Sequence, residues 1–256
     1  MNLKGKNAII TGASKGIGKA IALRLAQEGI NVALAARTKE TLDEALKEIK
    51  SKSKVKVIGV ACDVAKLADL ENLVNVTKKE LGQIDILVNN AGVSSQYPFE
   101  KQPFDDFEKL VQTNFLGYVR LIRLVINDMI TRKSGHIINS VSGSTLVDPV
   151  PRGFVTYSSL KVGLRAFLKG LFWEMRDHGI KVTSILPGVV DSDLTDKLQD
   201  ISKEQGDRLL KTETVVEMVM YALSVPDNAN PLELAVINQQ TPWTKPVIDY
   251  QQKQAK

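Results

Sequence analysis

Short runs of aliphatic and β-branched residues alternate along this chain with longer segments of helical periodicity, and no other feature restricts the possible folds as strongly. The alternation predicts a parallel sheet, because each connection between parallel strands must return over one face of the sheet. Seven runs are predicted to form strands: Asn7–Thr11, Val32–Ala36, Val55–Ala61, Ile84–Val88, Gly135–Val141, Lys181–Leu186 and Leu234–Ile237. Five segments with apolar residues every three or four positions are predicted to form helices: Gly16–Glu28, Thr41–Ser51, Leu67–Leu81, Phe104–Arg132 and Thr156–His178.

The predicted architecture is a single α/β domain that spans residues 1–256. We expect a doubly wound parallel sheet of about seven strands with helices on both faces. The 256 residues, 43% of them hydrophobic, suffice for one large core, and no linker, repeat or low-complexity tract divides the sequence. Ligands of such sheets bind beyond the carboxyl ends of the strands, so functional residues are expected in the loops that follow them.

The composition argues against several kinds of site and partner. Cys62 is the sole cysteine, which excludes an internal disulfide and a cysteine-based metal cage, and the two histidines, His136 and His178, lie apart from any acidic cluster. We therefore predict no metal site and no Ser-His-Asp catalysis. The net charge of +5 is dispersed, which indicates a solvated surface rather than a nucleic-acid interface. Without a signal peptide or a spanning apolar stretch, we expect a soluble, cytoplasmic protein with no membrane partner.

A glycine-rich turn follows the first predicted strand and leads directly into a helix. Glycines there allow a tight turn and a close approach of the backbone to a pyrophosphate, whose charge is met by the amide groups at the helix N-terminus. In the context of strand, turn and helix, this pattern predicts a dinucleotide site. Its expected contacts are Gly12, Ser14, Lys15, Gly16, Ile17 and Gly18.

The end of the second strand indicates which dinucleotide is bound. Enzymes that use NAD usually carry an acidic residue there for the ribose hydroxyls, whereas a cation accommodates the 2′-phosphate of NADP. The strand ends in Ala35-Ala36-Arg37, with no acid, and Lys15 of the glycine turn can approach the same phosphate. We therefore predict NADP(H), although Arg37 also fits a surface cation at the end of a strand.

The third and fourth strands are followed by two further candidate segments. Asp63, next to Val64, is placed to accept a hydrogen bond from the adenine amine, and it fits a helix cap equally well. The small residues Ala91 and Gly92 leave room for the adenosine ribose. Asn90 belongs to the same candidate set, but it can equally serve to tie neighbouring strands together.

Tyr157 and Lys161 are spaced four residues apart on a predicted helix, so both project from one face. An ammonium group beside a phenol favours the phenolate, which makes the hydroxyl a better acid and base near neutral pH. Alone, such a pair also fits a packed ring beside a solvated charge. The other motifs of the chain favour the catalytic reading.

Several motifs occur together in a fixed order between about residue 5 and about residue 200: TGASKGIG at 11–18, NNAG at 89–92, Asn114, Ser140, YSSLK at 157–161 and PG at 187–188. This set resembles the short-chain dehydrogenase/reductase family. The resemblance implies a Rossmann-like fold and four catalytic residues. Tyr157 exchanges a proton with the substrate oxygen, and Lys161 lowers the pKa of Tyr157 and holds the nicotinamide ribose. Ser140 binds the substrate oxygen, and Asn114 distorts its helix and positions a water molecule.

The resemblance also assigns residues after the sixth strand. Pro187 and Gly188 pass the nicotinamide, while the Val190 backbone and the Ser192 hydroxyl hold its carboxamide. Residues 192–211 are expected to form a substrate lid. The choice of Ser140 rests on the glycine three positions later, and Ser142 is then a loop residue near the pocket.

Two segments depart from the family pattern. The chain between Ser140 and Tyr157 is longer than usual, and residues 146–152 are expected to form a loop beside the substrate. The C-terminal strand lacks the usual glycine turn after it, although its exposed edge favours a homodimer or homotetramer.

The combined features predict an NADPH-preferring oxidoreductase that interconverts a ketone or aldehyde and an alcohol, without a metal. Within the family, the general likeness is to 3-oxoacyl-thioester reductases and related carbonyl reductases. An NAD(P)-dependent alcohol or sugar dehydrogenase that works toward oxidation is one alternative. A dinucleotide-binding sensor without turnover is another.

Overall fold

The computed structural model describes residues 3–147, 150, 153–192, 194–195, 198 and 207–242. Its centre is a seven-stranded sheet with the order β3-β2-β1-β4-β5-β6-β7, in which every neighbouring pair is parallel. The predicted parallel sheet is thus confirmed, with strand ends within two residues of those expected. The strands are β1 Asn7–Thr11, β2 Asn31–Ala36, β3 Val57–Ala61, β4 Ile86–Asn89, β5 Gly135–Ser140, β6 Ile180–Pro187 and β7 Glu233–Val236.

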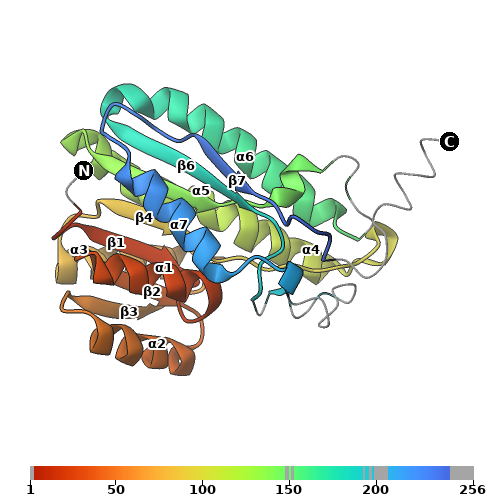
Figure 1. Cartoon of the computed structure of the whole chain (residues 1–256), viewed down its shortest axis with the longest axis horizontal. Helices are drawn as coiled ribbons and strands as arrows, with labels where there is room; N and C mark the ends of the chain where they lie inside the picture. The colour runs from red at the N-terminus through yellow and green to blue at the C-terminus, as the bar shows by residue number, and fades with distance from the viewer. Residues whose placement is uncertain are drawn as a thin grey trace.

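Helices cover both faces of the sheet, as the alternation predicted (Figure 1). One face packs against α1 (Gly16–Gln27), α2 (Lys39–Lys52) and α7 (Thr212–Ser224). The other packs against α3 (Leu67–Leu81), α5 (Gly117–Arg132) and α6 (Val155–Met175). Shorter elements are α4 (Phe104–Val111), the π-helical turn η2 (Gln112–Leu116) and the 3-10 turns η1 (Phe99–Lys101), η3 (Gly143–Leu146) and η4 (Arg176–His178).

The strands read as nearly continuous apolar runs because both faces of the sheet are buried. On β1, Ala8 and Ile10 point into the core beneath α1 and α7, and Ile9 between them points into the core beneath α3 and α5. All three side chains are fully buried. Successive side chains of a strand point to opposite faces of the sheet, so β1 contributes to two separate apolar cores.

Helix α7 was not predicted from the sequence. Its buried residues are Val215, Val216, Met218, Val219, Ala222 and Leu223, which recur at the three- and four-residue spacing of an amphipathic helix. This periodicity was the signal that could have identified α7 from the sequence. No helix in the described part of the chain has the length and apolar character needed to span a bilayer.

The predicted helix Phe104–Arg132 is wrong in one respect, because η2 interrupts it. Asn114 lies in this π-helical turn and is fully buried. Its side-chain oxygen accepts from the Val93 amide at 3.1 Å, and its side-chain nitrogen donates to the Val93 carbonyl at 2.8 Å. A π-helical turn widens the helix locally, and here the turn coincides with these bonds to the loop after β4. The expected distortion at Asn114 is therefore present.

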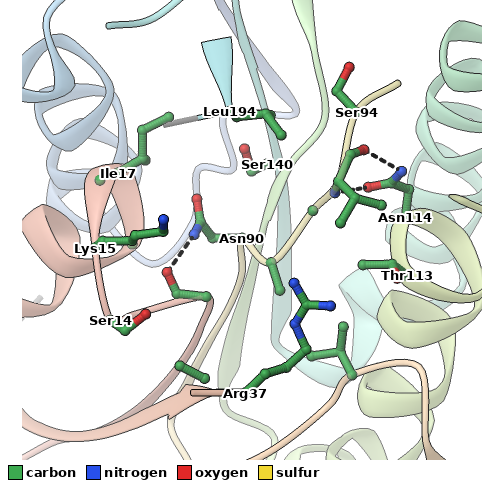
Figure 2. Close-up of a pocket in the computed structure, with 18 of the residues that line it drawn as sticks. Ser14, Lys15, Ile17, Arg37, Asn90, Ser94, Thr113, Asn114, Ser140 and Leu194 are labelled. Carbon is green, nitrogen blue, oxygen red and sulfur yellow. Dashed lines mark hydrogen bonds between the residues drawn. The ribbon is translucent and has the colours of Figure 1, made fainter. Parts of the chain in front are cut away.

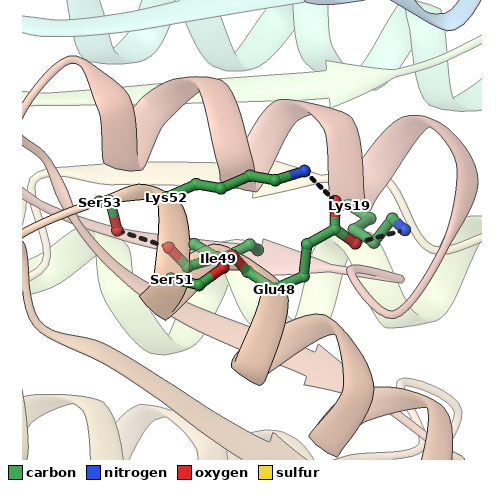
Figure 3. A network of polar contacts seen from close by, with 6 residues as sticks. All are labelled: Lys19, Glu48, Ile49, Ser51, Lys52 and Ser53. Atoms are coloured by element: carbon green, nitrogen blue, oxygen red, sulfur yellow. Dashed lines mark hydrogen bonds and ion pairs between the residues drawn. The ribbon is translucent and has the colours of Figure 1, made fainter.

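The strand order reverses between β1 and β4, which opens a crevice at their carboxyl ends. The helices α1 and α2, which follow the first two strands, flank this crevice and are tied together by an ion-pair network (Figure 3). Glu48 of α2 accepts from Lys19 of α1 at 3.0 Å and from Lys52 at 2.8 Å. The network therefore joins α1 to α2 at the surface of the domain.

Candidate active site

A groove with a cavity volume of about 400 Å³ lies at the carboxyl ends of the strands. This volume is within the range of small-molecule and cofactor sites. The groove collects most of the predicted site residues from eight separate segments of the chain. They are Gly12, Ser14, Lys15, Gly16, Ile17, Gly18, Arg37, Asp63, Val64, Asn90, Ala91, Gly92, Asn114, Ser140, Tyr157, Lys161 and Ser192.

The glycine turn forms one wall of the groove, and two of its glycines adopt left-handed backbone conformations. Gly12 has φ +66° and Gly16 has φ +53°, a region that favours glycine. A Cβ on Gly18 would lie 2.3 Å from the Gly12 carbonyl oxygen and 2.6 Å from the Asn90 side-chain nitrogen. No side chain caps the N-terminus of α1. The turn therefore leaves a close-fitting backbone cradle and helix amides for an anionic group, which fits a pyrophosphate.

Asn90 ties the glycine turn to the end of β4, as one of its two readings predicted, and Figure 2 shows its side-chain nitrogen bonded to the Gly12 carbonyl. Its side-chain nitrogen donates to the Thr11 carbonyl at 3.0 Å. The Thr11 hydroxyl in turn accepts from the amides of Asn90 and Ala91, at 2.9 and 3.0 Å. These bonds hold the floor of the groove, and contact of Asn90 with a cofactor stays a prediction.

Arg37 extends from the end of β2 toward the groove (Figure 2). Its side chain is exposed, and none of the ion pairs among the described residues includes it. Thr38 and Thr41 line the groove beside it, and the sequence analysis did not select them. Their position next to Arg37 on the β2–α2 connection was the available signal. The three side chains together offer a cation and two hydroxyls to an anionic group.

Asp63 lines the groove and closes a local turn. One of its carboxylate oxygens accepts from the Ala65 amide at 3.1 Å, and the Asp63 amide donates to Asp69 at 2.8 Å. The helix-cap reading of Asp63 is therefore wrong, because Lys66 is the N-cap of α3 and Asp63 closes a local turn before the helix. Contact with adenine stays a prediction.

Lys161 is buried in the opposite wall, at the meeting of α5, β5 and α6. Its ammonium nitrogen donates to the Ser140 carbonyl at 2.9 Å and lies 4.8 Å from the ring centroid of Tyr118. Burial disfavours the charged form and lowers the pKa of Lys161 to about 7. Tyr118 is 2% exposed, and sequence reasoning missed it because it belongs to none of the recognised motifs.

The effect expected of Lys161 on the pKa of Tyr157 is not found in this structure. Burial raises the pKa of Tyr157, and the opposing effect comes from a hydrogen bond with the Ser142 side chain. Lys161 lies 6.0 Å from the Tyr157 ring centroid, and its nitrogen is bonded to Ser140 instead. A partly neutral lysine aimed at a carbonyl has little power to stabilise a phenolate.

The two candidate serines occupy different positions. Ser140 lines the groove, and its carbonyl oxygen receives Lys161. Ser142 precedes η3 as a loop residue, and its hydroxyl accepts from the Ser144 amide at 3.1 Å. Its side chain opposes the rise that burial causes in the pKa of Tyr157. The choice of Ser140 as the serine that binds the substrate oxygen stays a prediction.

The segment after β6 reaches the groove only in part. Ser192 lines it, but Pro187, Gly188 and Val190 are not among its lining residues. The Val190 carbonyl accepts from the Thr195 hydroxyl at 2.5 Å, so it is already engaged. The expected lid at 192–211 lies mostly outside the described residues, as does much of the 146–152 loop. Among the described residues, no group of three His, Cys, Asp or Glu side chains is placed to hold a metal ion.

Comparisons with known proteins agree with the architecture. The profile of the family described as short chain dehydrogenase matches residues 6–203. An uncharacterized oxidoreductase of Staphylococcus saprophyticus is 34% identical over 238 residues, which are 92% of this chain and 98% of that protein.

Two solved structures carry bound cofactors. An actinorhodin polyketide ketoreductase with NADPH has a TM-score of 0.83 at 30% identity, over 91% of this chain and 96% of that one. A 7α-hydroxysteroid dehydrogenase complexed with NADH and an oxo bile acid has a TM-score of 0.85 at 25% identity, over 95% and 98%. Of these two similar proteins, one thus binds NADPH and the other binds NADH.

Proposed function

The chain belongs to the short-chain dehydrogenase family, and we propose that it is an NADPH-preferring oxidoreductase that interconverts a ketone or aldehyde and an alcohol. The observation that carries the proposal is a single groove. It joins the glycine turn and Arg37 at one end to Tyr157 and Lys161 at the other. Hydride transfer requires a dinucleotide and a proton donor to meet the same substrate carbon and oxygen, and this layout supports such a meeting.

The preference for NADPH rests on the end of β2. Arg37 is exposed at the groove with Thr38 and Thr41 beside it, and no acidic residue occupies the strand end. A carboxylate there would repel a 2′-phosphate, whereas a guanidinium and two hydroxyls favour it. The NADPH bound to the similar polyketide ketoreductase is consistent with this choice.

The protein groups supply the acid–base part of the reaction, and a bound nicotinamide would supply the hydride. In reduction, the hydride goes to the carbonyl carbon, and the Tyr157 hydroxyl gives its proton to the oxygen, so that an alcohol forms. Ser140, which lines the groove, is the candidate to stabilise charge on that oxygen, while the Ser142 side chain opposes the rise in the pKa of Tyr157. Burial raises the pKa of Tyr157 above its ordinary value, so the hydroxyl carries the proton that reduction requires.

The substrate class is inferred from the family and from similar solved structures. A small-molecule carbonyl compound or alcohol fits a family member with this groove, and 3-oxoacyl thioesters remain the specific candidate by likeness to reductases of the family. The similar ketoreductase acts within polyketide chemistry by its name, which is compatible with an oxoacyl substrate. Oxidation of an alcohol with NAD is the alternative, and the NADH in the similar hydroxysteroid dehydrogenase keeps it relevant.

Titration of the purified protein with NADPH and with NADH is the first test, followed by a panel of carbonyl substrates with the tighter cofactor. We expect markedly tighter NADPH binding and turnover of at least one ketone or aldehyde. Equal or tighter NADH binding would contradict the phosphate site and direct the search to oxidisable alcohols. Tight binding without turnover of either substrate class would favour a non-catalytic sensor.

We further infer that the protein forms a homodimer or homotetramer. Large apolar side chains are exposed on α4 and α6, among them Phe104 at 87% exposure and Trp173 at 58%. Strand β7 also forms an edge of the sheet, next to β6 alone among the described strands. Such surfaces favour association between copies. Sedimentation velocity over a range of concentrations will give the state, and a monomer throughout would contradict the inference.

A further inference from the structure

The Ser140 carbonyl lies at the end of β5 and receives two hydrogen bonds from opposite sides. Lys161 of α6 donates to it at 2.9 Å, and the Tyr118 hydroxyl of α5 donates at 3.1 Å. A carbonyl oxygen has two lone pairs, so these donors fill its capacity. The three groups come from three elements, and each belongs to a side chain or strand end that is buried or lines the groove.

Lys161 has an unusual environment for a buried lysine. None of the ion pairs among the described residues includes it, and the titratable groups that face it are Tyr118 on α5 and Tyr157 on α6. Asn114, on the neighbouring η2, is neutral and bonded to Val93. The ammonium therefore relies on one carbonyl and on the face of the Tyr118 ring, 4.8 Å away, where the negative π-face attracts a cation.

We propose that Tyr118 is a positioning residue for Lys161. Its ring holds the ammonium beside Ser140, and its hydroxyl keeps the Ser140 carbonyl satisfied when Lys161 turns toward the cofactor. The inference rests on the proposed function, because it assumes that Lys161 contacts the ribose of a bound dinucleotide. It adds a residue outside the predicted catalytic set and gives its ring and its hydroxyl separate tasks.

The hydroxyl matters when Lys161 leaves its resting position. A buried carbonyl that loses its last donor carries the full cost of an unsatisfied group, which opposes the movement. The Tyr118 hydroxyl still donates to the Ser140 carbonyl after Lys161 moves away, so the movement does not leave this carbonyl without a hydrogen bond. Burial raises the pKa of Tyr118 above its ordinary value, so its hydroxyl stays a donor throughout the neutral range.

The ring matters for the charge of Lys161. Burial alone lowers the pKa of Lys161 to about 7, so its charged fraction falls as the pH rises through neutrality. A ring that favours the ammonium opposes this loss. Removal of the ring should therefore lower the pKa of Lys161 further, while a phenylalanine at the same position should preserve it.

Tyr118→Phe and Tyr118→Leu separate the role of the hydroxyl from the role of the ring. Tyr221→Phe is the matched control, because Tyr221 is exposed on α7. In Tyr118→Phe we expect NADPH to bind about tenfold more weakly, the effect of one lost hydrogen-bond donor, with the titration of Lys161 unchanged. In Tyr118→Leu we expect the same weakening, and a Lys161 titration midpoint lower by about one pH unit. The Tyr221→Phe control should match the wild type in NADPH affinity and in the titration midpoint of Lys161.

The Lys161 midpoint is measured in cofactor-free protein by NMR of ¹³C-labelled lysine, with the signal assigned by its loss in Lys161→Arg. This readout does not depend on turnover, so it remains informative if the proposed function fails. Wild-type NADPH affinity in Tyr118→Phe would overturn the role of the hydroxyl. An unchanged midpoint in Tyr118→Leu would overturn the role of the ring. Should the leucine variant not fold, Tyr118→Met takes its place.

Discussion

At one end of the groove the polar groups belong to a single turn and the strand beside it, whereas at the other they come from three elements far apart in the sequence. The nucleotide end consists of backbone in the glycine turn and exposed cations such as Arg37. The reacting end consists of Tyr118, Ser140, Lys161 and Tyr157, which are buried or half-buried and share partners. Single substitutions should therefore change cofactor affinity and selectivity at the nucleotide end, and should lower kcat strongly at the reacting end.

Tyr157→Phe should give the largest effect, because it removes the proton donor and leaves the ring. We expect kcat to fall by about 10²- to 10⁴-fold, the usual contribution of general acid catalysis, while NADPH affinity is retained. Steady-state kinetics and a binding titration of the same preparation will show both. Full activity in this variant would remove Tyr157 from the mechanism.

Ser142→Ala and Ser140→Ala test which serine serves the reacting end. Ser140 lines the groove, so loss of its hydroxyl should lower kcat by on the order of 10²-fold, as for a donor to a developing oxyanion. Ser142→Ala should cost less, because Ser142 is not among the groove-lining residues and acts only on the pKa of Tyr157. The comparison of kcat between the two variants is the measurement, and the reverse order would give the role to the Ser142 hydroxyl.

Gly18→Ala tests the close packing of the nucleotide end. The added Cβ would meet the Gly12 carbonyl oxygen at 2.3 Å, so the turn must shift. We expect a loss of about 1–3 kcal/mol in the free energy of unfolding and weaker NADPH binding.

Gly170→Ala is the matched control, since this glycine lies within α6 and nothing lies within 4 Å of its added Cβ. It should gain about 0.5–1 kcal/mol from helix propensity. Urea unfolding curves measure both variants, and equal stabilities would contradict the clash at Gly18.

Arg37→Asp should change selectivity more than stability, because the side chain is exposed. The new carboxylate repels a 2′-phosphate, and we expect the ratio of NADPH to NADH affinity to fall by about tenfold or more. Lys39→Asp is the control: it makes the same charge change two residues away, outside the groove lining. Equal effects of the two substitutions would reduce Arg37 to a general surface charge.

Glu48→Gln should have the smallest effect, because the ion pairs between α1 and α2 are partly exposed. Hydrogen bonds from Lys52 and Lys19 lower the pKa of Glu48 to about 2 from an ordinary value of 4.5. Its stabilising contribution is therefore complete above about pH 4.5 and is lost as the pH falls toward 2.

The loss in the free energy of unfolding of Glu48→Gln at neutral pH should stay below about 1 kcal/mol, as for other solvated ion pairs. Urea unfolding at pH 7 and pH 3 will show whether the difference between variant and wild type shrinks in acid. A difference that grows on acidification would contradict the ion-pair explanation.

The nucleotide end was predictable because its structure depends on neighbours in the sequence. The glycine pattern after β1 required left-handed backbone, and Gly12 and Gly16 adopt it. At the reacting end, the sequence predicted which residues belong to the site but not which of them contact one another. Tyr118 donates to a carbonyl 22 positions away, so this partner could not be read from local spacing. The break at η2 likewise depends on Val93, 21 positions from Asn114.

By itself, the sequence determined the parallel sheet, the strand ends that carry functional residues, the glycine cradle and the Tyr157–Lys161 pair, because each follows from periodicity or from spacing within one element. Only the tertiary structure decided which groups contact the Lys161 ammonium and in which direction the pKa values of Lys161 and Tyr157 move. Those properties depend on burial and on partners from α5, β5 and α6 at once. Burial is a consequence of the packing of the whole domain, and no single segment of the chain encodes it.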